Sequence, residues 1–157
     1  MDQEQLFKNR NADQDSEKKA VEWMESNNLS YVRYGLDALK SGLPIWNIPQ
    51  FVRSAPDYII FTNAVMAKDK KPMFLEFKSF YKSIKLKTRD LEEYIVWGRS
   101  MPLYILFYDI QNNAFSLNKL DNIVKSMFSN LCKMGHYPES ADNTYYFIEK
   151  EWLVNFK

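Results

Sequence analysis

The sequence predicts an α/β fold in which a mixed β-sheet is flanked by helices. Two segments rich in strand-forming residues, 57–62 and 73–78, are separated by a polar turn and are expected to form a hairpin. A third segment, residues 103–108, is apolar on both sides, which is typical of a central strand covered on both faces. Apolar residues at helical spacing precede, separate and follow these strands, and 157 residues suit one domain.

The first part of the chain is expected to hold one helix. Residues 1–14 are polar without sustained periodicity, and they predict a tail or a short extra helix outside a single domain of residues 15–157. Ser16 is a candidate N-cap, and Asn27 with Asn28 should end the helix. The side of this helix that is expected to be buried carries Ala20, Val21, Trp23 and Met24.

A short strand and a long connection are expected next. Residues 31–34 predict the strand, and residues 35–55, which contain glycines and prolines, predict an irregular connection with one helical turn. Connections of this length are uncommon inside a compact domain and are often functional.

The second half of the chain is expected to contain two helices around the apolar strand 103–108. Thr88 is a candidate cap for the first, in which Leu91, Tyr94, Ile95 and Gly98 recur at helical spacing. The second is predicted over residues 117–134, with Gly135 as its C-cap, and residues 145–152 predict a final strand. The predicted element order is therefore α, β, β, β, α, β, α, β.

Composition excludes several classes of function. No apolar run approaches the roughly 18 residues that span a bilayer, and the N-terminus lacks a signal-peptide layout, so a cytoplasmic protein without a membrane partner is expected. Cys132 is the only cysteine and is expected to be a small buried side chain of the last helix. His136 is the only histidine and is expected at that helix's end, which argues against histidine-based catalysis or a histidine-rich zinc site.

The net charge of +1 conceals a local basic stretch. For nucleic-acid binding, a local concentration of cations matters more than the total charge, although such a run alone is more often a solvated surface. The residues that form the stretch are Lys68, Lys70, Lys71, Lys82, Lys85, Lys87 and Arg89.

One set of residues carries recognisable chemistry. The period of two in strand 73–78 puts Glu76 and Lys78 on the same face, and hairpin pairing can bring the carboxylate of Asp57 beside Glu76. Two carboxylates that close repel each other, whereas a divalent cation converts the repulsion into a binding site. A lysine beside such a site can polarise a nucleophilic water or stabilise developing negative charge. The alternative is an ordinary ion pair between Glu76 and Lys78 on a half-exposed strand.

At these residues the sequence resembles the PD-(D/E)XK nuclease superfamily, which includes restriction endonucleases, Holliday-junction resolvases and related phage and repair nucleases. Pro56-Asp57 is followed at a suitable spacing by Glu76-Phe77-Lys78. The resemblance extends from Glu17 to Asp109, and the predicted elements match the restriction-endonuclease-like αβββαβ core, here followed by a C-terminal helix and strand.

The resemblance implies a set of site residues. Asp57, Glu76 and the main-chain carbonyl of Phe77 would ligate Mg²⁺, for which Mn²⁺ would substitute, and Lys78 would assist the attacking water. Glu17, which the helical register aims inward, would join the catalytic set. The polar residue that many relatives carry in the helix after the lysine has no assigned counterpart among Arg89, Asp90 and Glu93.

The predicted function is metal-dependent hydrolysis of phosphodiester bonds in DNA, as in nucleases of phages or mobile elements. Substrate phosphates would be held by Lys82, Lys85, Lys87 and Arg89. Two alternatives stay open: an RNA endonuclease of the same fold, and a nucleic-acid-binding module that keeps the fold without turnover. Assembly as a homodimer is left open as well.

Overall fold

A computed structural model describes residues 3–36, 44, 47–62, 71–138 and 140–157, except for the side chains of 3–14, 62 and 140–142. Most of the predicted hairpin turn, including Lys68 and Lys70, lies outside these residues. The helices and strands are α1 (Gln3–Ser26), β1 (Leu29–Arg33), α2 (Gln50–Arg53), β2 (Tyr58–Thr62), β3 (Met73–Phe80), β4 (Ile84–Lys87), α3 (Thr88–Gly98), β5 (Leu103–Asp109), β6 (Ala114–Lys119), α4 (Leu120–Ser129), β7 (Met134–Tyr137), β8 (Ser140–Ile148) and the 3-10 helix η2 (Lys150–Trp152).

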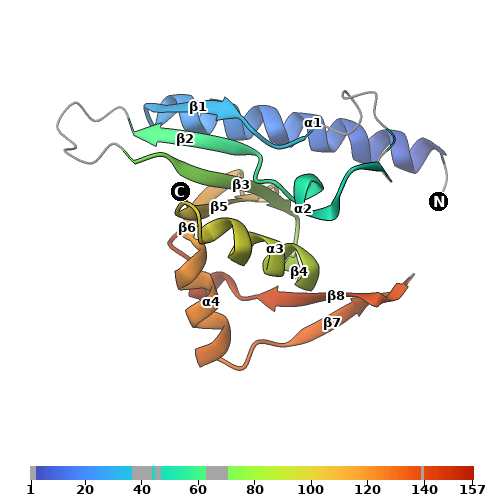
Figure 1. Cartoon of the computed structure of the whole chain (residues 1–157). Helices are drawn as coiled ribbons and strands as arrows, with labels where there is room; N and C mark the ends of the chain where they lie inside the picture. Colours follow the sequence, from blue (N-terminus) through green and yellow to red (C-terminus); the bar gives the residue numbers. More distant parts are fainter. Residues whose placement is uncertain (1–2, 37–43, 45–46, 63–70, 139) are drawn as a thin grey trace.

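The molecule is built around a five-stranded sheet with the order β1-β2-β3-β5-β6. Strands β3 and β5 are parallel and the other neighbours are antiparallel, so the sheet is mixed, as predicted. Helix α1 packs on one face, α3 and α4 pack on the other, and a second sheet of order β4-β8-β7 lies against α3 (Figure 1). The predicted αβββαβ core is present as α1, β1, β2, β3, α3 and β5.

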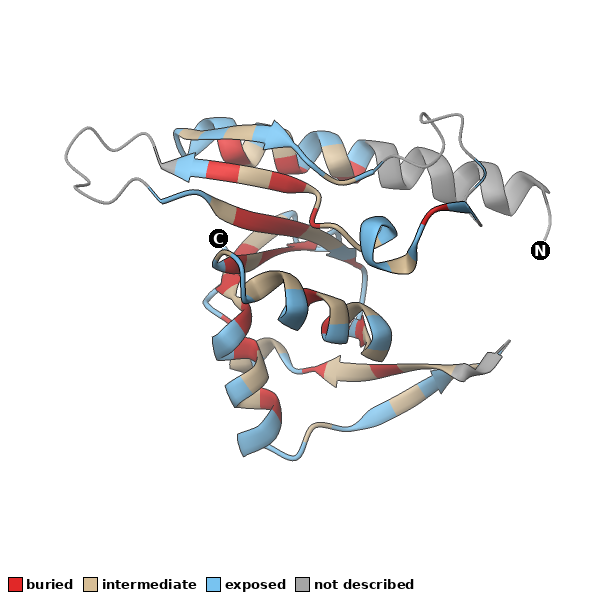
Figure 2. Cartoon of the chain, in the orientation of Figure 1, coloured by how far each residue is buried: buried red, intermediate tan, exposed pale blue. Residues whose placement is uncertain are grey.

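The two central strands divide the core between the faces of the sheet. Phe74 and Phe107 pack with α3 and α4, whereas Leu75 and Leu106 pack with α1. This alternation confirms the predicted register of β3 and explains why buried residues concentrate along β3 and β5 in Figure 2. Glu76 shares the parity of Phe74 and therefore faces α3.

Helix α1 begins at Gln3 and not at Ser16, so the predicted N-cap is wrong. Ser16 is 6% exposed in the middle of the helix, and with Ala20 and Met24 it forms a buried row at a spacing of four residues. A small side chain suits this position against the sheet. The predicted end is confirmed, because Asn28 has a left-handed φ of 55°.

The predicted helix over residues 117–134 is wrong at both ends. Residues 114–119 form β6, in which Leu117 pairs with Leu106 of β5, and only Leu120–Ser129 is helical. Gly135 lies in β7 and is not a C-cap, and His136 lies in the same strand. Cys132 follows the helix, half-buried, and its thiol donates to the Phe147 carbonyl over 2.8 Å.

Two other boundaries differ from the prediction. Thr88 is the first residue of α3 and makes no cap; its hydroxyl is instead hydrogen-bonded to that of Thr144 over 2.7 Å. The predicted final strand is β8, which starts earlier, at Ser140, and ends at Ile148. Within the described part of the chain, no helix is both long and apolar enough to cross a bilayer.

Candidate active site

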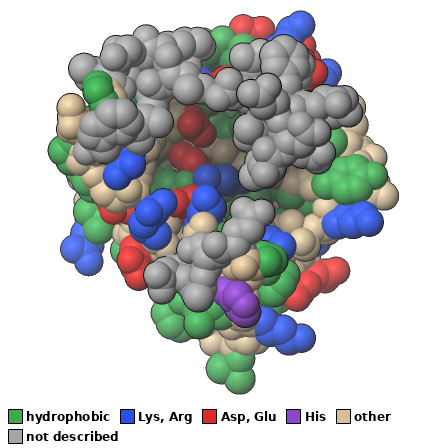
Figure 3. All heavy atoms as spheres, turned by 90° about the vertical axis from the view of Figure 1, so that its right-hand side faces the viewer, with side chains coloured by type: hydrophobic (Ala, Val, Ile, Leu, Met, Phe, Trp, Pro, Cys, Tyr) green, Lys and Arg blue, Asp and Glu red, His purple; other side chains and the backbone are tan. Residues whose placement is uncertain are grey.

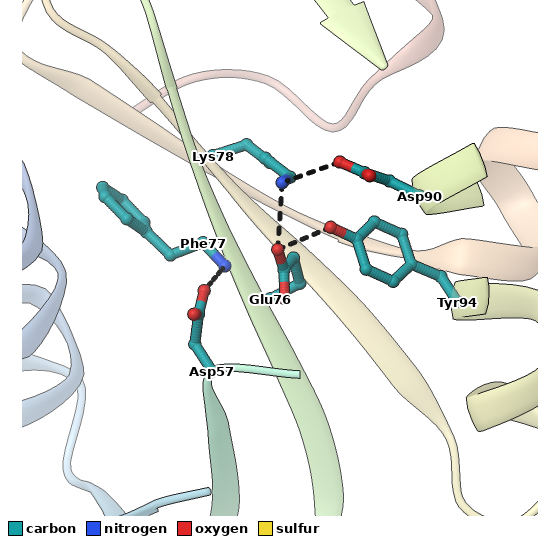
Figure 4. A network of polar contacts seen from close by, with 6 residues as sticks. All are labelled: Asp57, Glu76, Phe77, Lys78, Asp90 and Tyr94. Carbon is teal, nitrogen blue, oxygen red and sulfur yellow. Dashed lines mark hydrogen bonds and ion pairs between the residues drawn. The ribbon is translucent and has the colours of Figure 1, made fainter. Parts of the chain in front are cut away.

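The predicted acidic pair meets where β2 and β3 begin to pair. Tyr58 is paired with Leu75, and continuing this antiparallel register sets Asp57 opposite Glu76. The Asp57 carboxylate accepts a hydrogen bond of 2.8 Å from the backbone N–H of Phe77 (Figure 4). The structure therefore brings these three predicted residues together.

The backbone of Asp57 is fixed by the end of β1. Its carbonyl accepts hydrogen bonds from the N–H groups of Tyr34 and Gly35, at 2.9 and 3.1 Å. A Cβ on Gly35 would lie 3.1 Å from both Asp57 Cα and the Pro56 carbonyl oxygen. Only glycine fits this close backbone approach without a shift, so Gly35 helps to set the position of the carboxylate.

Glu76 is a buried carboxyl group, 7% exposed, with two partners on the α3 side of the sheet. The Tyr94 hydroxyl donates to its Oε1 over 2.6 Å, and Lys78 Nζ lies 3.0 Å from the same oxygen. Burial raises the pKa of Glu76 from 4.5 to about 7, the charge of Asp57 adds to the rise, and Lys78 and Tyr94 oppose it.

Burial also raises the pKa of the half-buried Asp57, and the Phe77 N–H, Lys78 and Arg33 offset only part of the rise. The pKa values of both carboxyl groups are therefore raised, chiefly because burial disfavours their charged forms. Close carboxylates in this condition favour a bound cation.

Lys78 is held between two acids. Its Nζ lies 3.0 Å from Glu76 and 3.5 Å from Asp90 Oδ2, and its side chain is 31% exposed. Burial lowers the pKa of Lys78, but the neighbouring Glu76, Tyr94 and Asp90 outweigh it and hold the pKa well above its ordinary value. The ammonium group therefore stays charged at neutral pH.

Helix α3 supplies the two residues of this network that the sequence analysis did not assign, Asp90 and Tyr94. They lie four residues apart and so project from one side of the helix (Figure 4). The sequence did indicate that Asp90 and Tyr94 lie on one face of the helix, because residues four positions apart share a face. The direction of that face toward Glu76 follows only from the packing of α3 on β5 and β8.

A cavity of about 250 Å³ opens onto this network. The face in Figure 3 is hollowed there, with acidic and basic side chains in and beside the hollow. Three arginines from separate elements line the cavity together with Asp57, Glu76 and Lys78: Arg33 from β1, Arg53 from α2 and Arg89 from α3. Arg33 and Arg53 carried no signal in the sequence.

Glu17 points toward the sheet, as its helical register predicts, whereas Glu22 is exposed and pairs with Lys19. The Glu17 carboxylate forms an ion pair with Arg33 and accepts a 3.4 Å hydrogen bond from the Tyr58 hydroxyl. Because Arg33 lines the cavity, Glu17 is linked to the site through that arginine.

The predicted phosphate-binding residues divide into two groups. Arg89 lines the cavity. Lys85 and Lys87 lie on β4 in the second sheet, with their ammonium groups over aromatic rings, and Lys82 precedes that strand beside Tyr81. These residues form one stretch in the sequence, and strand β4, which separates them in space, was not among the predicted elements.

Comparison with solved structures confirms the fold. The chain is similar to Hjc, a Holliday junction resolvase from Archaeoglobus fulgidus, with a TM-score of 0.52 and 10% identity over 88% of this chain and 89% of that one. It is also similar to D212, a nuclease from a fusselovirus, with a TM-score of 0.46 and 13% identity over 97% of this chain and 84% of that one. No protein-family model matches the sequence, and no curated protein does.

The chain therefore has the fold of a Holliday junction resolvase, which is the fold that the resemblance to the PD-(D/E)XK superfamily predicts.

Proposed function

We propose that the chain is a divalent-metal-dependent deoxyribonuclease whose catalytic residues are Asp57, Glu76 and Lys78. One observation carries the proposal: Asp57, Glu76 and Lys78, predicted from a short sequence pattern, line one cavity together. Glu76 and Lys78 are bonded to Tyr94 and Asp90, and the Asp57 carboxylate is bonded to the N–H of Phe77 between them. Glu76 is 7% exposed and burial raises its pKa to about 7, whereas the carboxyl group of an ordinary surface ion pair is exposed to solvent.

The donor set fits Mg²⁺. Asp57 and Glu76 offer hard carboxylate oxygens with raised pKa values, and the main-chain carbonyl of Phe77 is the proposed third ligand. Among the described residues, no group of three acidic, histidine or cysteine side chains could hold a metal. Mg²⁺ suits so sparse a set because it retains several waters and binds through one or two carboxylates plus substrate phosphate, and Mn²⁺ is expected to substitute. When bound, the metal would activate water and polarise the scissile phosphate.

The residues around the metal ligands have distinct proposed roles. Lys78, which stays charged, holds and polarises the attacking water or stabilises the negative charge that develops on the phosphoryl oxygens, and does not act as the base. Asp90 and Tyr94 position Lys78 and Glu76. Glu17 contributes through Arg33, whose guanidinium it holds at the cavity wall.

DNA is the proposed substrate. Three arginines and Lys78 line the cavity, and such cations bind phosphates without reading sequence. The solved structure whose fold this chain shares is named as a Holliday junction resolvase, so branched DNA belongs among the substrates to be tested.

The test is a cleavage assay on plasmid, linear duplex, single-stranded and four-way-junction DNA and on RNA. Each is incubated with Mg²⁺, Mn²⁺, Ca²⁺ or EDTA. We expect cleavage of DNA with Mg²⁺ or Mn²⁺ and none with EDTA. Asp57→Asn, Glu76→Gln and Lys78→Ala should each reduce the rate by roughly 100-fold or more, whereas Glu22→Gln, an exposed control on α1, should not.

Other outcomes would contradict the proposal in different ways. Cleavage that persists in EDTA or in Asp57→Asn would reject the proposed metal site. Cleavage of RNA alone would show that RNA, and not DNA, is the substrate. DNA binding with no cleavage under any metal would favour the non-catalytic module.

A further inference from the structure

The outer face of the second sheet combines lysines with aromatic rings. In β4, Ile84 and Leu86 are buried in the core, so Lys85 and Lys87 point to the opposite side. In β8, Tyr146 and Ile148 pack with the core. The residues paired with the lysines are Tyr145 and Phe147, and Tyr137 of β7 completes the set. We call Lys85, Lys87, Tyr137, Tyr145 and Phe147 the lysine–aromatic face.

Contacts within the lysine–aromatic face are close. Lys85 Nζ lies 4.6, 5.7 and 6.0 Å from the ring centroids of Tyr145, Tyr137 and Phe147, and Lys87 Nζ lies 5.8 Å from that of Tyr137. The Tyr145 ring meets the other two edge to face, at 4.7 and 5.0 Å. Gly135 makes room for it, because a Cβ there would lie 2.9 Å from the ring.

Within the described part of the chain, the lysines of this face have no acidic partner. Among the residues that the structure describes, no acidic side chain forms an ion pair with Lys85 or Lys87, whereas Lys78, Lys119 and Lys150 all have such partners. Two ammonium groups over aromatic rings suit a partner that offers both anionic groups and flat rings. A nucleic-acid strand offers phosphates and bases together.

The lysine–aromatic face is joined to the cavity. Lys87 is followed by Thr88 and then by Arg89, which lines the cavity. The Thr88 hydroxyl is bonded to that of Thr144, the residue before Tyr145, so the start of α3 is tied to β8. In Figure 1 the β7–β8 pair extends beneath α3 toward the side that is viewed in Figure 3, where the hollow opens.

We infer that the lysine–aromatic face binds an unpaired, single-stranded segment of nucleic acid and leads it toward the cavity. Bases in a duplex stack on one another and present only their edges, whereas unpaired bases have free faces that can stack on the partly exposed rings of Tyr137 and Phe147. Tyr145 is only 7% exposed and supports these two rings through its edge-to-face contacts. The surface lies outside the cavity, so this inference goes beyond the proposed hydrolysis and needs neither metal nor turnover.

The experiment measures fluorescence anisotropy of a labelled oligothymidylate and of a duplex of equal length, both in EDTA. Tyr137→Ala should weaken oligothymidylate binding roughly 5- to 100-fold, with an unchanged salt dependence and little effect on the duplex. Tyr137→Phe, which keeps the ring, should bind like the wild type. The double variant Lys85→Ala, Lys87→Ala should reduce the slope of log affinity against log salt by about 1.4.

Matched controls are available on α4, away from this face. Phe128→Ala removes an 80% exposed aromatic side chain and Lys125→Ala an exposed lysine, and neither should alter binding. Wild-type affinity in both Tyr137→Ala and the double-lysine variant would overturn the inference, as would an equal loss for the duplex. If Tyr137→Ala fails to fold, the lysine variant decides the question by its salt slope.

The inference and the proposed function fail separately. Loss of cleavage in every metal, with intact oligothymidylate binding in EDTA, would reject only the nuclease. Normal cleavage with unaltered oligothymidylate binding in the variants would reject only the single-strand surface.

Discussion

The titration of Glu76 predicts how the stability of the metal-free protein depends on pH. The perturbation is Glu76→Gln, which keeps the shape of the side chain and its ability to accept a hydrogen bond from Tyr94, but removes the ionisable group. Burial raises the pKa of Glu76 from 4.5 to about 7 in the folded state. The unfolded chain therefore loses this proton at lower pH than the folded protein does.

The sign and size of the effect follow from that difference. A raised folded-state pKa contributes stability that is fully present below about pH 4.5 and is lost as the pH rises through about 7. A difference of about 2.5 pKa units corresponds to about 3 kcal/mol at about 1.4 kcal/mol per unit. The wild-type free energy of unfolding should fall by this amount, relative to Glu76→Gln, between about pH 4 and pH 8.

The assay is urea unfolding in EDTA at several pH values, followed by fluorescence of the four tryptophans. The informative quantity is the difference between the wild-type and Glu76→Gln curves, because groups common to both proteins cancel to first order. Glu22→Gln is the control, since Glu22 is exposed. Parallel curves for wild type and Glu76→Gln would refute the argument that burial keeps this carboxyl group protonated.

Four further predictions concern the site. Lys78→Ala should lose cleavage but still bind Mg²⁺ in calorimetry, whereas Glu76→Ala should lose both; equal loss of metal affinity would reject the role proposed for Lys78. Tyr94→Phe leaves Glu76 without its 2.6 Å hydrogen bond and should cost about 1–3 kcal/mol in urea unfolding, with no change meaning that the hydroxyl is not a partner. Gly35→Ala should push the end of β1 away from Asp57 and lower both stability and activity, and an active, stable variant would contradict the close approach. Glu17→Gln should lower activity more than Glu22→Gln under saturating Mg²⁺; no loss in either would exclude α1 from catalysis.

The acidic pattern of the candidate site was predictable because strand periodicity is local. The alternation along β3 sets Glu76 and Lys78 on the face of Phe74, and Leu75 on the other, whatever the rest of the chain does. The same reasoning separates Glu17 from Glu22 on α1. Both predictions depend only on backbone geometry within a few residues of a strand or a few turns of a helix. A sequence pattern encodes that geometry directly.

The C-terminal half shows where pattern reading fails. A helical period fits Leu117, Leu120, Ile123 and Val124. Leu117 nevertheless belongs to β6, where it pairs with Leu106, because β6 supplies backbone hydrogen bonds to the side of β5 that β3 does not cover. Strands β4 and β7 have four residues each, too short for a reliable alternation, and they form only because β8 lies between them. Because β4 was not predicted, the sequence could not show that Arg89 lies at the cavity whereas Lys85 and Lys87 lie on the lysine–aromatic face.

The sequence by itself determined the fold class and the order of the central elements, because these follow from hydrophobic periodicity along the chain. It also predicted that Asp57, Glu76 and Lys78 lie together, since that proximity depends on pairing within one hairpin. Tertiary structure decided which side chains complete the network. Tyr94 reaches Glu76 from 18 residues away, and Arg33 and Arg53 enter the cavity from separate elements. Such contacts depend on how α3, β1 and α2 pack around the sheet, and that packing results from burial of many apolar side chains together, which no local pattern contains.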